Sequence, residues 1–165
     1  MTTLDPPRAP FPGAKRYRHV LLPLDGSETA EIALADAATV AASNGARLTL
    51  LYVVPPALAE MYGAATIADD EPEGLRRDAA HGYLDSVRAK LEATSIEAHT
   101  AVVVGDAAEA ILAYASEHGV DLVVMATHGR SGWRRWVLGS VAERVVRAAT
   151  EPVLLVRVPP AGGER

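Results

Sequence analysis

Short apolar runs alternate along this chain with longer stretches whose apolar residues recur at helical spacing. Runs that are apolar on both faces are typical of strands in a parallel sheet that is covered by helices. Five runs fit this description: 19–24, 47–54, 100–104, 122–125 and 152–156. The pattern therefore predicts five buried strands.

The stretches between these runs predict four helices, over 27–43, 73–93, 106–118 and 140–149. The first is rich in alanine and holds no glycine or proline, and Asn44 and Gly45 after it form a helix stop signal. The last two begin with Asp106 and Ser140, each followed three residues later by glutamate, which is a capping-box pattern.

Five strands alternating with four helices predict an α/β fold, an open five-stranded parallel sheet with helices on both faces. We expect residues 1–17 to form a disordered, proline-rich leader, 18–158 a single domain and 159–165 a flexible tail. Segment 57–72 shows no firm pattern, and both a mobile flap and a disordered connection fit it.

Composition and charge exclude several classes of protein. The chain has no cysteine, which excludes a disulfide framework and a cysteine-based zinc site. Its formal net charge of −5 argues against general nucleic-acid binding, and no apolar run is long enough to span a membrane. The leader lacks the apolar core of a signal peptide, so we expect a cytoplasmic protein.

In open parallel sheets, ligands bind beyond the carboxyl ends of the strands, which directs attention to the residues just after each strand. Asp25 comes directly after the first strand, where its carboxylate can accept hydrogen bonds from a ribose hydroxyl or an adenine amino group. Alternatively, Asp25 only caps the next helix together with Glu28.

A glycine-punctuated loop comes after the fourth strand and leads into the helix at Ser140. A strand, such a loop and a helix N-terminus together are suited to holding a phosphate. The loop is neither a Walker A loop nor a Gly-x-Gly-x-x-Gly motif. Between Leu122 and Ala142 there is no acidic residue but there are three arginines, Arg130, Arg134 and Arg135. Ser140 can serve both as a helix cap and as a phosphate contact.

These segments resemble the universal stress protein family over residues 18–158. The resemblance rests on HVLLPLDGSE (19–28), LLYV (50–53), DLVVMATHGRSG (121–132), LGSVAE (138–143) and PVLLV (152–156). In the ATP-binding branch of the family the motif is glycine, two residues, glycine, nine residues, glycine, then serine or threonine. Gly129, Gly139 and Ser140 match it, whereas Ala126 stands where the first glycine is expected. We expect an ordinary strand-end conformation at Ala126, since a left-handed one is costly for alanine.

The resemblance implies a Rossmann-like fold of the adenine nucleotide α-hydrolase-like kind with strand order 3-2-1-4-5, and ATP as the ligand. Pro23 and Asp25 would lie at the adenine–ribose end, and Val53 would meet adenine through its backbone. Met125 and Ala126 would line the ribose. The phosphates would be surrounded by His128, Gly129, Gly139, Ser140 and Val141. Asp25 is also a candidate ligand for Mg²⁺.

The terminal strand, from Val153 to Val158, is expected at an edge of the sheet, with Arg157 as its only charge. An exposed apolar edge invites pairing, so a homodimer through this strand is expected, as the resemblance also implies. Trp133 and Trp136 in the glycine loop fit either packing on their own domain or a partner surface.

Three functions remain open on these observations. The first is an ATP-binding stress protein in which nucleotide occupancy acts as a switch, with at most slow hydrolysis. The second is an enzyme that slowly hydrolyses ATP or transfers its adenylyl group, although the loop supplies no lysine for the phosphates. The third is an interaction protein of the same fold with an empty nucleotide site, and Ala126 is the feature that favours it.

Overall fold

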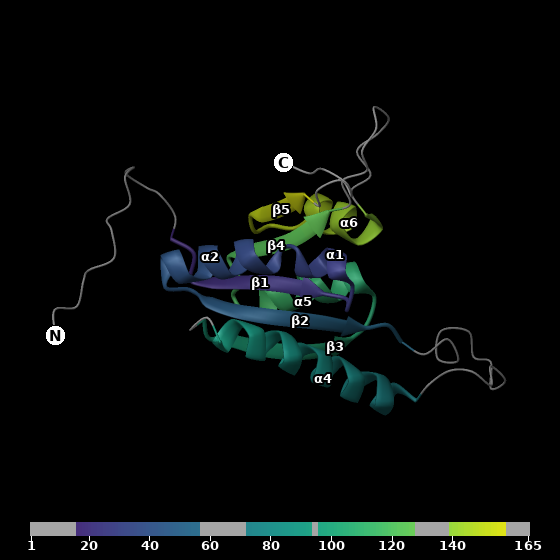
Figure 1. Cartoon of the computed structure of the whole chain (residues 1–165). Coiled ribbons are helices and arrows are strands. Elements are labelled where there is room, and N and C mark those ends of the chain that lie inside the picture. The colour runs from purple at the N-terminus through teal and green to yellow at the C-terminus, as the bar shows by residue number, and fades with distance from the viewer. Residues whose placement is uncertain (1–15, 57–71, 94–95, 128–138, 158–165) are drawn as a thin grey trace, which may run out of the picture.

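A computed structural model describes residues 16–56, 72–93, 96–127 and 139–157 (Figure 1). Its elements are β1 (His19–Leu24), α1 (Glu28–Glu31), α2 (Leu34–Asn44), β2 (Arg47–Val54), α4 (Glu73–Glu92), β3 (Ala98–Val104), α5 (Ala107–Glu117), β4 (Leu122–Thr127), α6 (Ser140–Ala148) and β5 (Val153–Arg157). The expected leader up to residue 15, the segment 57–71 and the expected tail lie outside the described residues.

All five strands form one parallel sheet in the order β3-β2-β1-β4-β5, which confirms the predicted fold class. The chain runs from the centre at β1 outward to β3, then returns to place β4 on the other side of β1 and β5 at the far edge (Figure 1). The direction of winding thus reverses between β1 and β4. This is the topological switch point, where such sheets bind ligands.

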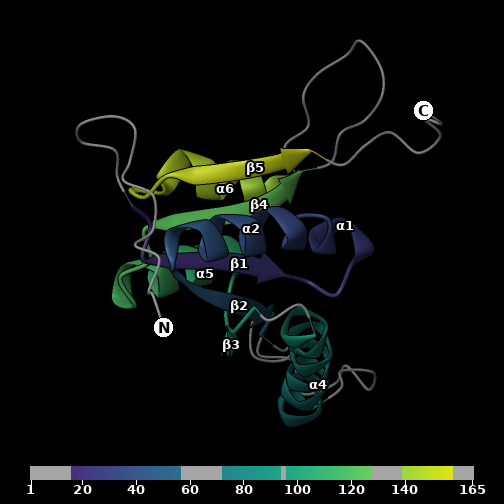
Figure 2. The ribbon, with the colours of Figure 1, turned by 60° about the vertical axis from the view of Figure 1, so that its left-hand side comes forward.

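Helices cover both faces of the sheet because successive residues of each strand point to opposite faces. Leu22 of β1 belongs to a buried cluster with residues of α2 and α4, whereas Leu21 belongs to a second cluster with residues of α5 and α6. Figure 2 shows α2 on one side of the sheet and α5 and α6 on the other.

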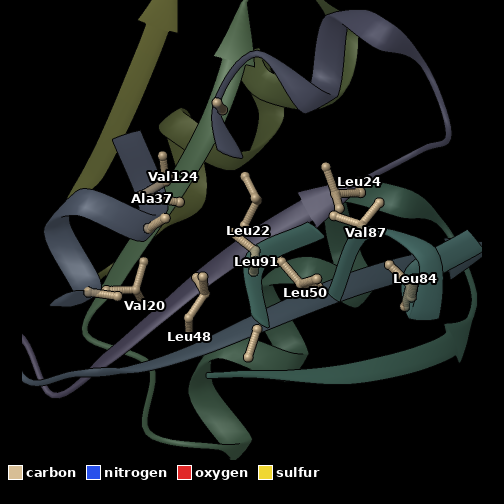
Figure 3. Packing of buried hydrophobic residues seen from close by; sticks show 14 of the residues in the cluster. Val20, Leu22, Leu24, Ala37, Leu48, Leu50, Leu84, Val87, Leu91 and Val124 are labelled. Carbon is tan, nitrogen blue, oxygen red and sulfur yellow. The ribbon is translucent and has the colours of Figure 1, made fainter. Parts of the chain in front are cut away.

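The first cluster gathers buried apolar side chains from four strands, β1 to β4, and from the helices α2 and α4 (Figure 3). Leu22, Leu50 and Leu84 are fully buried in it, and Val124 of β4 closes it toward the far edge. Burial of a side chain of this kind contributes on the order of 1.5–3 kcal/mol. The packed sheet therefore provides a rigid frame for the loops at its two ends.

The predicted helix over 27–43 is wrong in one respect, because it is broken after Glu31. The amides of Ile32 and Ala33 donate to the carbonyls of Thr29 and Ala30, three residues back, so the helix tightens and restarts as α2. The predicted stop is confirmed, since Gly45 ends α2 with a left-handed φ of 64°.

Several strand boundaries also differ from the prediction: β4 continues to Thr127, two residues beyond the predicted end, and β5 continues to Arg157. β3 starts two residues earlier, at Ala98, because it pairs with β2 from Leu48 onward. Pro152 lies before β5 rather than in it. Proline has no amide to donate, but its carbonyl accepts a hydrogen bond from the amide of Val123 at 3.0 Å. The predicted edge position of the last strand is confirmed.

Candidate functional site

A cavity of about 270 Å³ opens at the carboxyl edge of the sheet, at the switch point between β1 and β4. Its walls come from β1, α1, β2, α5, β4 and α6. The residues that line it are Pro23, Leu24, Asp25, Ser27, Thr29, Ala30, Val53, Ala107, Ile111, Met125, Ala126, Gly139, Ser140, Val141 and Ala142. Segments far apart in the sequence thus meet around one space.

Most of the residues predicted from the sequence belong to this lining. They are Pro23, Asp25, Val53, Met125, Ala126, Gly139, Ser140 and Val141. His128 and Gly129, together with Trp133 and Trp136, lie outside the described residues. The sequence reasoning missed the contribution of α1 (Thr29 and Ala30) and of α5 (Ala107 and Ile111). Their positions directly after β1 and β3 were the available signal.

The turn after β1 holds Asp25 at the mouth of the cavity. Gly26 makes this turn with a φ of 82°, which favours glycine. The amide and hydroxyl of Ser27 donate to Asp25 Oδ1, at 3.0 and 2.6 Å. Within the described part of the chain both bonds go to Oδ1, so Oδ2 is left for a ligand.

Ser27 is the residue that caps α1, because its Oγ accepts a hydrogen bond from the amide of Ala30 at 3.1 Å. The alternative that Asp25 caps this helix is therefore wrong. Asp25 instead orients Ser27 through the two bonds to Oδ1 and remains exposed beside the cavity.

The start of α6 differs from the prediction as well. Gly139 occupies the cap position and Ser140 is the first helical residue, so the predicted role of Ser140 as the cap is wrong. Because this cap is a glycine, it offers no side-chain acceptor to the amides of the first turn. Helix amides without such a partner, at the positive end of the helix dipole, favour an anion. The first turn of α6, from Ser140 to Ala142, lines the cavity.

An ion pair joins the start of α5 to the middle of α6, and both helices contribute to the cavity lining. Asp106 caps α5 by accepting from the amides of Ala108 and Glu109, both at 3.1 Å, as the sequence predicted. Its second oxygen accepts from Arg144 Nη1 of α6 at 2.8 Å. The Arg144 guanidinium and the helix amides hold the pKa of Asp106 below its usual value.

Ala126 has the strand conformation that was expected for it. It lies within β4, with Val156 of β5 as its Cα partner, so its backbone is extended. This half-buried residue forms part of the lining, and the cavity is open beside it. The methyl group therefore narrows the site at this wall without filling it.

Neither a metal-binding cluster nor a membrane-spanning helix occurs among the described residues. No group of three or more histidine, aspartate or glutamate side chains in these ranges is arranged to hold a metal ion. Asp25 as a ligand for Mg²⁺ therefore stays a prediction. None of the helices in the described ranges is long and apolar enough to cross a membrane.

Comparison with known proteins gives concordant matches. The model of the universal stress protein family matches residues 16–157. Universal stress protein MJ0531 of Methanocaldococcus jannaschii is 32% identical over 148 residues, which are 89% of this chain and 86% of that protein. Universal stress protein MJ0577 of the same organism is 27% identical over 154 residues, which are 86% of this chain and 95% of that protein.

Solved structures agree with these matches. The structure of MJ0577 superposes with a TM-score of 0.72 at 28% identity, covering 89% of this chain and 100% of that chain. A universal stress protein in complex with cAMP superposes with a TM-score of 0.62 at 25% identity, covering 86% of this chain and 98% of that chain.

Proposed function

This chain belongs to the universal stress protein family, and we propose that it binds an adenine nucleotide, ATP, in the cavity between β1 and β4. One observation carries the proposal. Eight residues singled out from the sequence converge on this cavity from β1, β2, β4 and the start of α6. Such convergence at the switch point is the arrangement by which open parallel sheets bind nucleotides.

The lining of the cavity offers groups that suit both parts of a nucleotide. Asp25 offers a carboxylate oxygen to a ribose hydroxyl or an adenine amino group, and Val53 and Pro23 belong to the same lining. The first turn of α6, which also lines the cavity, presents an anion-favouring helix end to the phosphates. That a relative of the same fold is bound to cAMP supports an adenine ligand.

The volume is close to that of small-molecule sites. At about 270 Å³ the cavity is slightly smaller than the range of roughly 300–1,000 Å³ that is typical of such sites. We expect His128 and Gly129 to complete the site on the phosphate side. We further propose that occupancy of the site acts as a switch of conformation or partner choice.

Substitution at Ala126 tests the proposal from both directions. Calorimetric titration of the wild type with ATP and Mg²⁺ should give a saturable heat. Ala126→Leu should abolish it, because the larger side chain occupies the lining, whereas Ala126→Gly should keep or strengthen it by removing the methyl group. Ala35→Leu, on the exposed face of α2, is the matched control and should bind as the wild type does.

Two results would contradict the proposal. If the wild type gave no heat at millimolar ATP, the chain would be an interaction protein with an empty site. If Ala126→Leu bound ATP as tightly as the wild type, the nucleotide would bind elsewhere. Turnover of ATP well above one per minute that is lost in Asp25→Ala would instead favour the enzymatic alternative.

We also propose a homodimer through the edge strand β5. β5 pairs only with β4 in the described sheet, and Leu154 is 36% exposed on it. An exposed apolar edge favours pairing with a second copy. Sedimentation at micromolar concentration should show a dimer for the wild type and a monomer for Leu154→Lys. A monomeric wild type would contradict the dimer. The cytoplasmic location stays a prediction.

A further inference from the structure

The wall of the cavity that α1 forms cannot hold its position by itself. α1 has four residues, Glu28–Glu31, and an isolated helix of one turn is unstable in water. Thr29 and Ala30 of this turn nevertheless line the cavity. Contacts from other elements must therefore fix α1, and they decide the shape of the wall.

At its N-terminal end, α1 is fixed by the Asp25–Ser27 turn described above. At its C-terminal end, two side chains of α4 hold Glu31. The Tyr83 hydroxyl donates to Glu31 Oε1 at 3.2 Å, and Lys90 Nζ donates to Glu31 Oε2 at 3.0 Å. Both carboxylate oxygens of Glu31 are thus engaged by residues more than 50 positions away in the sequence.

Tyr52 of β2 contacts both Tyr83 and the turn that carries Asp25. Its ring meets the ring of Tyr83 edge to face, with centroids 5.9 Å apart. Its hydroxyl lies 3.4 Å from the backbone carbonyl of Asp25, as a long hydrogen bond. A Cβ atom at Gly26 would lie 3.8 Å from that hydroxyl, so Tyr52 packs directly against the turn.

Tyr52 and Tyr83 both pack against the first buried cluster. Leu84 and Val87 of α4 belong to the same buried cluster as Leu24, the last residue of β1 (Figure 3). Burial, and next the charge of Glu31, raise the pKa of Tyr83. The phenol therefore keeps its proton and remains a donor to Glu31 across the physiological pH range.

We propose that Tyr83 and Lys90, by holding Glu31, are positioning residues for the nucleotide site. They hold α1 against the cavity from α4, and Tyr52 braces the turn that carries Asp25. This inference rests on the proposed function, because it assigns a role in that same site. By thermodynamic reciprocity, a nucleotide that needs α1 in place must also strengthen the contacts of α4 with Glu31.

Hydrogen exchange of the nucleotide-free protein tests whether these contacts fix α1. The amides of Glu31, Ile32 and Ala33 are hydrogen-bonded, so their protection is measurable. Tyr83→Phe removes only the hydroxyl and should raise exchange over residues 28–33 by about 3- to 10-fold, the usual effect of one lost hydrogen bond. Glu31→Ala should raise it further. Glu31→Gln keeps an acceptor for Tyr83 and should restore part of the protection.

The matched control for Lys90→Met is Arg88→Met on the same helix. Arg88 pairs with Asp85 and Glu92 within α4 and does not touch α1 in the described contacts. Lys90→Met should raise exchange over residues 28–33, and Arg88→Met should leave it as in the wild type. Unchanged exchange in both Tyr83→Phe and Glu31→Ala would overturn the proposal.

Nucleotide titration then tests the positioning role. If the wild type binds ATP, Tyr83→Phe should weaken the affinity by about 3- to 10-fold. The double variant Tyr83→Phe, Glu31→Ala should lose less affinity than the sum of the two single losses, because each single variant already removes the contact between these residues. Raised exchange with unchanged affinity would overturn the positioning role. A wild type that does not bind ATP would refute the proposed function alone, since the exchange data do not depend on nucleotide.

Discussion

Both ends of the sheet carry polar residues, but these residues differ in burial and in how many of their polar atoms bond within the protein. At the amino end, His19 is buried, with Nδ1 3.1 Å from the His118 carbonyl and Nε2 2.8 Å from Thr49 Oγ1. There the Asp121 carboxylate accepts from the amides of Arg18 and His19. At the carboxyl end, Asp25 is exposed and its hydrogen bonds engage a single oxygen in the described structure.

This difference separates stability from binding. At the amino end, partners within the protein satisfy the buried polar groups, so these groups tie β1 to β2, α5 and β4. At the carboxyl end, a cavity and a helix start whose cap residue is a glycine leave polar groups for a ligand. We therefore expect substitutions at the amino end to change the free energy of unfolding, and substitutions at the carboxyl end to change nucleotide affinity.

The largest effect is expected from His19→Ala. It removes a buried ring and leaves the Thr49 hydroxyl and the His118 carbonyl without this partner, which should lower the free energy of unfolding by about 2–4 kcal/mol. Urea denaturation measures this loss. His99→Ala, at an exposed position of β3, is the control and should change stability little. Both variants should bind ATP as the wild type does. If fully folded His19→Ala bound ATP more weakly, the amino and carboxyl ends of the sheet would be coupled.

Asp25→Asn should produce the opposite result. It keeps an oxygen to accept from Ser27 but removes the negative charge, so the fold should be retained while ATP affinity falls by about tenfold or more. Calorimetry measures the affinity, and urea denaturation checks the stability. Asp36→Asn, on the exposed face of α2, is the control. Equal affinities of Asp25→Asn and the wild type would remove Asp25 from the site.

A change of pH should have a smaller effect on the free energy of unfolding. Burial lowers the pKa of His19, so the folded state prefers the neutral ring and the unfolded state binds a proton more readily. The contribution of His19 is therefore complete above its unfolded pKa of 6.5 and is lost as pH falls below it. The free energy of unfolding should decrease from pH 7 to pH 5, and His19→Gln should flatten this slope. An equally steep slope in His19→Gln would assign it to other groups.

The smallest effect is expected from Arg144→Met, which cuts the link between α5 and α6 at the side of the cavity. The pair with Asp106 is exposed, and exposed ion pairs contribute little to stability. Nucleotide affinity should weaken by about twofold, since the start of α6 is held less firmly. Arg147→Met is the matched control, because among the described contacts Arg147 pairs with Glu143 inside α6 and with no residue of α5. If Arg144→Met and Arg147→Met bound ATP with the same affinity, the ion pair between Arg144 and Asp106 would have no role in the site.

The sequence by itself determined the sheet, its parallel strands and most of the described site. Apolar runs encode strands, and Gly45 and Asp106 encode helix ends, because these signals depend on residues only a few positions apart. The positions after β1 and β4 depend on the same local order and on the family resemblance, which is why Asp25, Ala126 and Ser140, predicted as site residues, all belong to the cavity lining.

Only the tertiary structure decided how the site is held. No glycine or proline marks the break after Glu31 in the sequence. Ser27 and Gly139 occupy the cap positions that local patterns predicted for Asp25 and Ser140. The contact of Tyr83 with Glu31 joins residues 52 positions apart. Such contacts depend on how the folded elements pack against one another, and local propensity carries no record of that packing.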